Sequence, residues 1–223
     1  MGKHTQNCTL IGKGVYGTIG VDQRSRLADA HFHTMIVTST LEASVIEGDK
    51  LVIKSGIVRC DGAIRVSSIS GSGDIEVGGD IICDEITFTG KLRCNGDIVC
   101  SGNLSVNGSL GTRHISGQTV RLNGVLKGHD VNSRALEVHP LRSTMFSRFD
   151  MDGYEDGSTV RHITAVTVEA NHLQCRTLTA DSAMLRNGSA VESATCATAL
   201  GIDRTSSVLL VNGDCQRIHL KTA

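Results

Sequence analysis

The chain of 223 residues has no tryptophan, one proline and an aromatic content of only 3%. A globular enzyme of this length would normally carry more aromatic side chains, whereas a narrow core of Ile, Leu, Val and Cys needs few of them. No run of eighteen apolar residues occurs, so we expect no transmembrane helix. The polar start is followed by no apolar segment, so we expect no secretory signal. The net charge of −1 predicts no direct binding to nucleic acid.

A regular glycine repeat runs through 86–110, where Gly90, Gly96, Gly102 and Gly108 are evenly spaced. Between the glycines, two apolar residues stand two positions apart, so both can point to one face of a short strand. Each glycine can adopt the positive φ that a sharp corner needs. The segments between corners are short for hairpins or a sandwich. The pattern therefore favours a solenoid, in which each strand pairs with the coils before and after it.

Three of these steps make one coil, as from Ile69 to Ile86 and from Ile86 to Leu104, and the register extends upstream of the regular stretch. Stacking such coils places like residues over like residues. The expected core stack is Ile64, Ile81, Ile98, Cys83, Cys100, Leu92 and Leu104. Because two sizeable apolar residues alternate in each strand, rather than one large and one small, we expect an all-β fold: a right-handed parallel β-helix with three faces.

The spacing divides the chain into four parts. We expect an irregular, glycine-containing lead-in at 1–35, a β-helix core at 36–139, an insert or loop at 140–160, and a continuing or second solenoid at 161–223. The lead-in contains a G-x-G-x-x-G match, but no other kinase or dinucleotide-binding motif follows it. The insert holds much of the chain's remaining bulk and is a candidate patch for a partner protein. Its large side chains are Met145, Phe146, Phe149 and Tyr154.

No motif predicts a catalytic group, a metal or a cofactor. The eight cysteines include no C-x-x-C pair, which argues against zinc, and without a secretory signal we expect reduced, buried thiols. His31 and His33 share a strand face but have no evident third ligand. The D-M-D-G-Y-E-D-G run lacks the full spacing of a calcium loop. We therefore expect a protein that is not an enzyme and needs no cofactor.

The stretch 71–108, GSGDIEVGGDIICDEITFTGKLRCNGDIVCSGNLSVNG, resembles the bactofilins, which are polymer-forming cytoskeletal proteins of bacteria. The likeness covers roughly 58–128. It implies a right-handed, three-faced β-helix that assembles end to end without nucleotide. It also implies a cytoplasmic scaffold, at times at the inner face of the membrane, with envelope or motility proteins as partners. The chain lacks the Pro-rich tails and the apolar membrane-targeting start of some members, so we expect any membrane association to be indirect.

A β-helix has two open ends whose unpaired backbone groups invite another strand. No amphipathic capping helix is evident at either terminus of this sequence, and the last residues follow an apolar pair. We therefore expect the end coils to pair between subunits and form a homopolymer. The candidate polymer contacts are Phe32, Val45, Leu210 and Leu220.

Two other functions remain open from the sequence alone. A hexapeptide-repeat acyltransferase would need a catalytic histidine, for which His114 and His129 are the candidates near regular coils. A non-polymerising β-solenoid adaptor would bind one protein through the insert. The mass of the particle separates the three, because an acyltransferase is expected to be a trimer, an adaptor a monomer or dimer, and a polymer open-ended.

Overall fold

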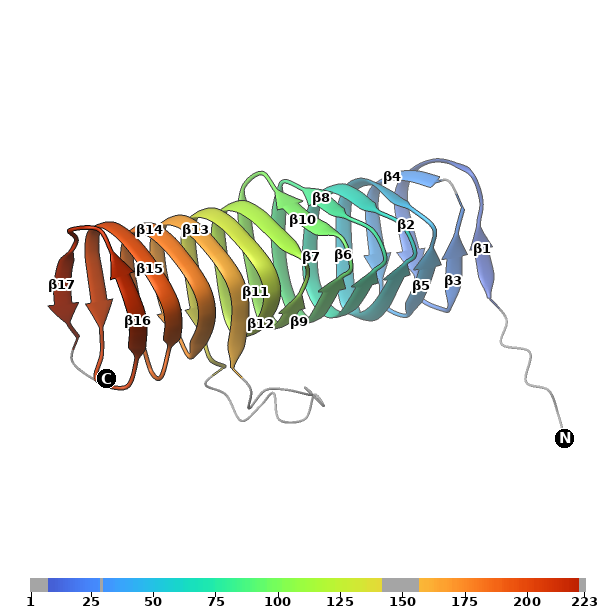
Figure 1. Cartoon of the computed structure of the whole chain (residues 1–223). Coiled ribbons are helices and arrows are strands. Elements are labelled where there is room, and N and C mark those ends of the chain that lie inside the picture. The colour runs from blue at the N-terminus through green and yellow to red at the C-terminus, as the bar shows by residue number, and fades with distance from the viewer. Residues whose placement is uncertain (1–7, 29, 142–156, 221–223) are drawn as a thin grey trace, which may run out of the picture.

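The computed structural model describes residues 8–28, 30–141 and 157–220 and shows a rod built entirely of β-strands. Within these ranges seventeen strands form one continuous sheet, and every pairing between them is parallel. The chain winds from the N-terminal end of the rod to the C-terminal end in about eleven turns, each pairing with the turns on either side (Figure 1). The expected fold class, a parallel β-helix, is thereby confirmed.

The strands vary from three to 26 residues because some continue around a corner of the coil without interruption. Their bounds are β1 Thr9–Ile11, β2 Gly14–Val21, β3 Ser25–Leu27, β4 Ala30–Val37, β5 Thr40–Ala43, β6 Ile46–Cys60, β7 Ile64–Val77, β8 Ile81–Cys83, β9 Glu85–Cys94, β10 Asp97–Cys100, β11 Asn103–Gly111, β12 His114–His139, β13 Ser158–Asn171, β14 Leu173–Arg186, β15 Ala190–Ile202, β16 Ser207–Asn212 and β17 Gln216–His219.

The core consists of columns of buried side chains that run along the rod, with one pair of inward positions in each strand segment. In the middle of the rod Ile98 pairs with Ile81, which pairs with Ile64, and Cys100 pairs with Cys83. All five side chains are buried. Two parallel columns complete the core of these coils. They contain Val58, Ile75, Leu92 and Leu110 on one side and Leu51, Ile69, Ile86 and Leu104 on the other.

One corner of the coil is built by a column of glycines. Gly73, Gly90, Gly108 and Gly124 pair in register, and each has a positive φ between 130° and 144°. A Cβ atom at Gly90 would lie 2.0 Å from the carbonyl oxygen of Gly73, and each later glycine meets the one before it in the same way. Only glycine fits this corner, because both the backbone conformation and the close approach exclude a side chain. Gly96 and Gly102, at the other corners, do not have a positive φ.

Several strands end at a buried cysteine whose thiol hydrogen-bonds to a backbone carbonyl of the corner that follows. The thiols of Cys60, Cys94 and Cys100 each donate to the carbonyl oxygen three positions further on, at 3.4 to 3.6 Å. Cys94 also reaches the Gly79 carbonyl of the preceding coil, at 3.1 Å. A thiol is a small hydrophobe with a weak donor, so it fills the core and still satisfies a corner carbonyl.

The solenoid continues without a break into the C-terminal part of the chain. Strand β12 pairs directly with β13, from Lys127 with Thr159 to Val138 with Ala170. The partners are about twice as far apart in sequence as those of an ordinary coil, yet their strands pair directly. The described residues therefore form one solenoid rather than two.

The N-terminal segment 1–35, expected to be irregular, already contains stacked strands. Strand β1 pairs with β3, and β2 pairs with β4, so that Tyr16 stacks on Phe32. These first coils are shorter than those of the middle, and several inward positions here are small or polar, such as Ser25 and Ala30. For both reasons the hydrophobic register is harder to see in the sequence than in the structure.

Candidate functional site: the two open ends of the solenoid

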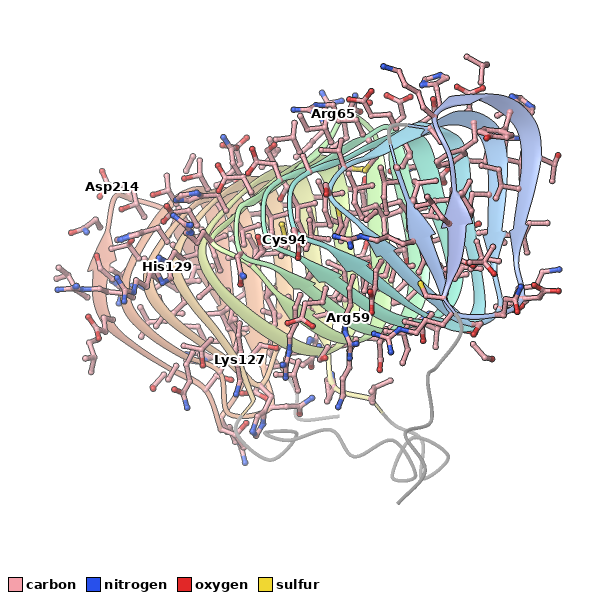
Figure 2. All side chains as sticks on the ribbon, turned by 90° about the vertical axis from the view of Figure 1, so that its right-hand side faces the viewer. Arg59, Arg65, Cys94, Lys127, His129 and Asp214 are labelled. Carbon is pink, nitrogen blue, oxygen red and sulfur yellow. The ribbon has the colours of Figure 1, made fainter. Side chains whose placement is uncertain are left out.

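The flanks of the rod are covered by charged side chains that pair along its axis. The Arg121 guanidinium contacts Glu137 at 2.6 Å, Arg65 contacts Glu47 at 3.4 Å, and comparable pairs recur elsewhere. In each case the partners lie on neighbouring coils. The hydrogen bond from Arg121 holds the pKa of Glu137 below its ordinary value. Arg65 and Arg59 project from different sides of the rod (Figure 2). Because these charges are already matched within the chain, they stiffen the flank more than they attract a partner.

His114, a candidate for catalysis, belongs to such a ladder. Its Nδ1 lies 2.6 Å from Asp97 Oδ1 and its Nε2 lies 2.9 Å from Asp130 Oδ2, on the coils before and after. The hydrogen bond to Asp97 raises the pKa of His114, and the charge of Asp130 adds to the effect. His129, the other candidate, donates its backbone N–H to the Arg113 carbonyl. With both ring nitrogens of His114 engaged by carboxylates, the contacts it makes are those of an ion-pair ladder.

The N-terminal end of the rod presents strands that are paired on one side only. Within the described residues β1 bonds only to β3 and β2 bonds only to β4. Ile11 continues the inward column above Leu27, and Tyr16 continues the one above Phe32. Both Ile11 and Tyr16 are half-buried against the core. This end therefore combines free backbone groups with partly open apolar columns.

The C-terminal end has the same construction on two of its three sides. Strands β16 and β17 both pair with β15 and, in the described chain, with nothing beyond it. Val208 pairs with Val191 and Val211 with Ala194, so both valines continue inward columns. On the third side β17 aligns Arg217 with Leu200. A cation at an inward register position disfavours pairing of an edge strand with another strand, so the addition of a further strand is disfavoured on this side of the end.

Exposed apolar side chains are concentrated at these two ends. Among the large apolar residues that the structure describes, the exposed fraction passes one half only at Leu10, Val15, Leu209 and Leu210, at 55% to 85%. All four lie in the first or the last coil. Elsewhere on the flank the largest such group is the stacked pair Ile82 and Val99, each less than half exposed. The ends are therefore where burial by a partner would gain most.

The structure moves two of the four expected polymer contacts away from the ends. Phe32 is fully buried beneath Tyr16, because the lead-in adds a further coil outside it. Val45 lies at a corner between β5 and β6, also inside the stack. Leu210 does lie in the last coil, but it pairs with Ser193 on the outer surface, whereas Val211 holds the inward position. Leu220 bonds to Ile202 through its backbone and packs beside Gly201.

Sequence reasoning missed Tyr16 and Ile11 as end residues, and within the expected end segment 208–220 it chose Leu210 rather than the inward Val211. The signal that would have found the first two is a shorter coil at the N-terminal end, which places Tyr16 before Phe32 and Ile11 before Leu27. The expected partner patch in the insert, Met145, Phe146, Phe149 and Tyr154, lies outside the described residues.

No group of three or more His, Cys, Asp or Glu side chains is arranged to hold a metal within the described ranges. Hollows on the flanks lie across successive coils, one of them at a corner lined by Arg93, Asn95 and Arg113 and another over the strands β13 to β16. No helix that could cross a membrane occurs in the part of the chain that the structure describes.

Comparison with protein families, with curated proteins and with solved structures found no match to this chain. The class of protein is therefore defined by architecture: a single-chain parallel β-solenoid whose described end strands are each paired on one side.

Proposed function

We propose that this protein is a structural scaffold that assembles end to end into a homopolymer without nucleotide, as the resemblance to bactofilins implies. The observation that carries the proposal is the pairing of β1, β2, β16 and β17 on one side only, together with the exposed apolar residues beside them. Stacking two ends would complete the ladder and bury these side chains. The role would be cytoplasmic and mechanical, in cell shape, envelope or motility machinery, with any membrane contact made through partners.

A head-to-tail arrangement fits the side chains of the two ends. Phe32 is accommodated because Gly48 stands beside its ring, where a Cβ would come within 2.6 Å of the ring carbons. Tyr16 occupies the same inward position one coil earlier. At the other end Gly213 follows the inward Val211 by two positions, as Gly48 follows Ile46. A Tyr16 ring from the next subunit would find there the space that only glycine leaves.

The test compares a residue in the inward column of the end coil with one on the outer surface. Val211→Glu places a charge where the next subunit would stack, so we expect it to reduce the assembly to single chains. Thr195→Glu is the matched control, because Thr195 pairs with Asn212 but is exposed on the outside. Sedimentation velocity should show large, heterogeneous species for the parent and the control. Arg217→Leu, which removes a cation from the inward register, should lengthen the assemblies.

Other outcomes would assign a different function. If the parent chain sediments as a single species whatever its concentration, the polymer proposal is wrong. A defined trimer would then favour the acyltransferase, and His114 would become the first residue to substitute. A monomer or dimer would favour the adaptor. Circular dichroism of each variant separates a lost interface from a lost fold.

A further inference from the structure

Two cysteines meet at the C-terminal end of the rod. Cys196 lies in β15 directly after Thr195, which pairs with Asn212 at the end of β16. Cys215 lies in the corner between β16 and β17, and this corner passes over the one that follows Cys196. The register continued from Thr195 and Asn212 places Gly213 opposite Cys196, where a Cβ would lie 3.2 Å from the Cys196 carbonyl oxygen, and Cys215 follows two positions further on. The thiols of Cys196 and Cys215 are close enough to interact. The pair therefore bridges the last coil and the one before it.

The two thiols differ in their exposure. The Cys196 side chain is buried, with 2% of its surface exposed, whereas Cys215 is half-buried and only packs against the edge of the core. Its neighbour Asp214 lies at the outer edge of the last coil (Figure 2). A small reagent in solution therefore reaches Cys215 first and has no direct route to Cys196.

We propose that Cys215 and Cys196 form a redox-active pair that closes to a disulfide when a small peroxide or disulfide oxidises Cys215. With hydrogen peroxide, the Cys215 sulfur attacks one oxygen, the O–O bond breaks, and a sulfenic acid and water form. The Cys196 sulfur then attacks the Cys215 sulfur, the S–O bond breaks, and a second water leaves with the Cys196 proton. Two thiols and one peroxide thus give one disulfide and two waters. With glutathione disulfide, Cys215 attacks one sulfur and releases one glutathione, and Cys196 then attacks the Cys215 sulfur of the mixed disulfide and releases the second.

The bond would run diagonally across a corner of the coil. The registers Thr195–Asn212 and Ala199–Gln216 place Gly213 opposite Cys196 and Cys215 two positions further on. Neighbouring coils lie about 4.8 Å apart and Cα atoms of bridged cysteines about 4.4–6.8 Å apart, so the turn of the chain at this corner has to bring Cys215 back toward Cys196. Burial raises the pKa of Cys196 to about 11, with the nearby Cys215 thiol adding to the shift. Cys196 therefore stays protonated and unreactive toward reagents in solution. The same thiol is already in place when the Cys215 sulfur becomes electrophilic.

A second stacked pair in the same chain serves as an internal control. Cys83 and Cys100 pair in register and their thiols interact, but both are buried and lie in the middle of the rod. Neither thiol is accessible to a small reagent while the coils stay closed. If proximity alone decided which thiols react, both pairs would form disulfides. If oxidation has to begin at an exposed thiol, only the Cys196–Cys215 pair forms one.

The Cys196–Cys215 disulfide would link the last coil covalently to the coil before it. A coil paired on one side is where local opening is cheapest, and a cross-link to β15 suppresses that opening. This consequence bears on assembly only if the proposed function holds, since a fixed end coil is a better template for the next subunit. The bond itself is independent of assembly and can form in a single chain.

The experiment treats the full chain, in a Cys8→Ser background that removes the exposed thiol, with hydrogen peroxide or glutathione disulfide. Free thiols are then alkylated, and the non-reduced tryptic peptides are mapped. We expect peptides 187–204 and 205–217 to appear linked and to separate on reduction, while Cys83 and Cys100 stay alkylated after denaturation. Cys215→Ser should abolish the linked peptide. Hydrogen exchange of β16 and β17 amides should slow on oxidation in the parent but not in Cys196→Ser.

The proposal is overturned if Cys215 is oxidised to the sulfinic acid, or capped by glutathione, without linkage to Cys196. It is equally overturned if the Cys83–Cys100 pair oxidises at the same rate, because exposure would then not decide the site. Carrying out the mapping on the monomeric fraction keeps a failure of this bond distinct from a failure to polymerise.

Discussion

The coils in the middle of the rod and those in its C-terminal part share one architecture but differ in length and in the size of their inward side chains. In the middle, a coil runs from Ile75 to Leu92 and the next from Leu92 to Leu110, and the columns are filled by Ile and Leu. Between β13 and β15 the coils are shorter, as from Val160 to Cys175 and on to Val191. There the inward positions include many small side chains, among them Ala165, Ala180, Ala183 and Ala194.

The corners differ in the same way. In the middle of the rod an asparagine ladder, in which Asn123 Nδ2 donates to Asn107 Oδ1 at 2.7 Å, runs beside the stacked glycines. In the C-terminal part such a ladder continues with an acidic partner: Asn187 Nδ2 donates to Asn171 Oδ1 at 2.7 Å, and the Asn187 N–H donates to Asp203 at 2.8 Å. Asn187 itself has a positive φ of 54°. The comparison shows that the backbone ladder holds the shape, while corner chemistry and core volume are adjusted together to the length of the coil.

The largest expected effect is at the glycine corner. Gly90→Ala places a methyl group 2.0 Å from the Gly73 carbonyl oxygen at a φ of +130°, so the backbone must move on two coils. We expect the free energy of unfolding to fall by about 3 kcal/mol or more. The measurement is urea unfolding followed by circular dichroism.

Two further glycines make this a test of the comparison. Gly188 also has a positive φ, but the heavy atom nearest to an added Cβ would be 3.9 Å away. Gly188→Ala should therefore lower the free energy of unfolding by only about 1–2 kcal/mol. A Cβ added at Gly111 would meet no heavy atom within 4 Å apart from those of its chain neighbours, so Gly111→Ala should be close to neutral. Equal losses at Gly90 and Gly188 would show that the two corners are not built differently.

The second prediction concerns the core columns. Ile86→Ala removes a fully buried side chain from the middle of the rod and should destabilise the chain by about 2–5 kcal/mol. Ala183 holds the matching column in β14 and is also fully buried, so Ala183→Ile should overfill a narrower coil and cost about 1–3 kcal/mol. Thermal and urea unfolding give both values. A stabilising Ala183→Ile would mean that the C-terminal core is hollow rather than narrow.

The third prediction tests the polar corner. Burial raises the pKa of Asp203, but hydrogen bonds from Asn187, Ser206 and Thr205 outweigh it and lower the pKa to about 2. A depressed pKa stabilises the fold above the unfolded value near 3.8, and this stability is lost as the pH falls toward about 2. Asp203→Ala should cost about 2 kcal/mol at neutral pH.

The loss at Asp203 should be confined to the end of the rod. Hydrogen exchange should therefore show β15 and β16 opening more readily in Asp203→Ala, with β6–β11 unchanged. Asp181→Ala is the control, because Asp181 is exposed and its carboxylate does not cap a corner. If both variants lose the same stability at neutral pH and in acid, the corner hydrogen bonds are not the cause.

The smallest expected effect is at the His114 ladder. The pKa of His114 is raised, so its contribution is present below the unfolded value near 6.5 and disappears as the pH rises through the folded value. The melting temperature of the parent relative to His114→Gln should therefore be highest in mild acid and converge at alkaline pH. A difference that grows with rising pH would contradict the ion-pair geometry.

The regular part of this fold could be predicted from the sequence because its signal is local. Strands with two inward positions each and corners at fixed spacing place Ile64, Ile81 and Ile98 in one column by counting alone. The C-terminal coils follow the same rule, but Ala, Ser and Thr carry little hydrophobic contrast, so counting does not place the register at 182–207.

The end coils and the polar corners depend on contacts between coils, which the spacing of residues in the sequence does not reveal. The first coil is hidden in the sequence because it is short and because inward residues such as Ser25 and Ala30 weaken the pattern. Sequence reasoning places Phe32 at an end because nothing in its own strand shows that Tyr16 covers it. The Asn171–Asn187–Asp203 corner and the Asp97–His114–Asp130 ladder join residues on different coils and become visible only when the coils are stacked.

The account's central claim is that the open ends of the rod stack between subunits, and negative-stain electron microscopy of the purified chain without nucleotide tests it most directly. The account predicts filaments or ribbons one rod wide that shorten to single particles in Val211→Glu and persist in Thr195→Glu. Uniform small particles from the parent chain, at every concentration tried, would contradict it.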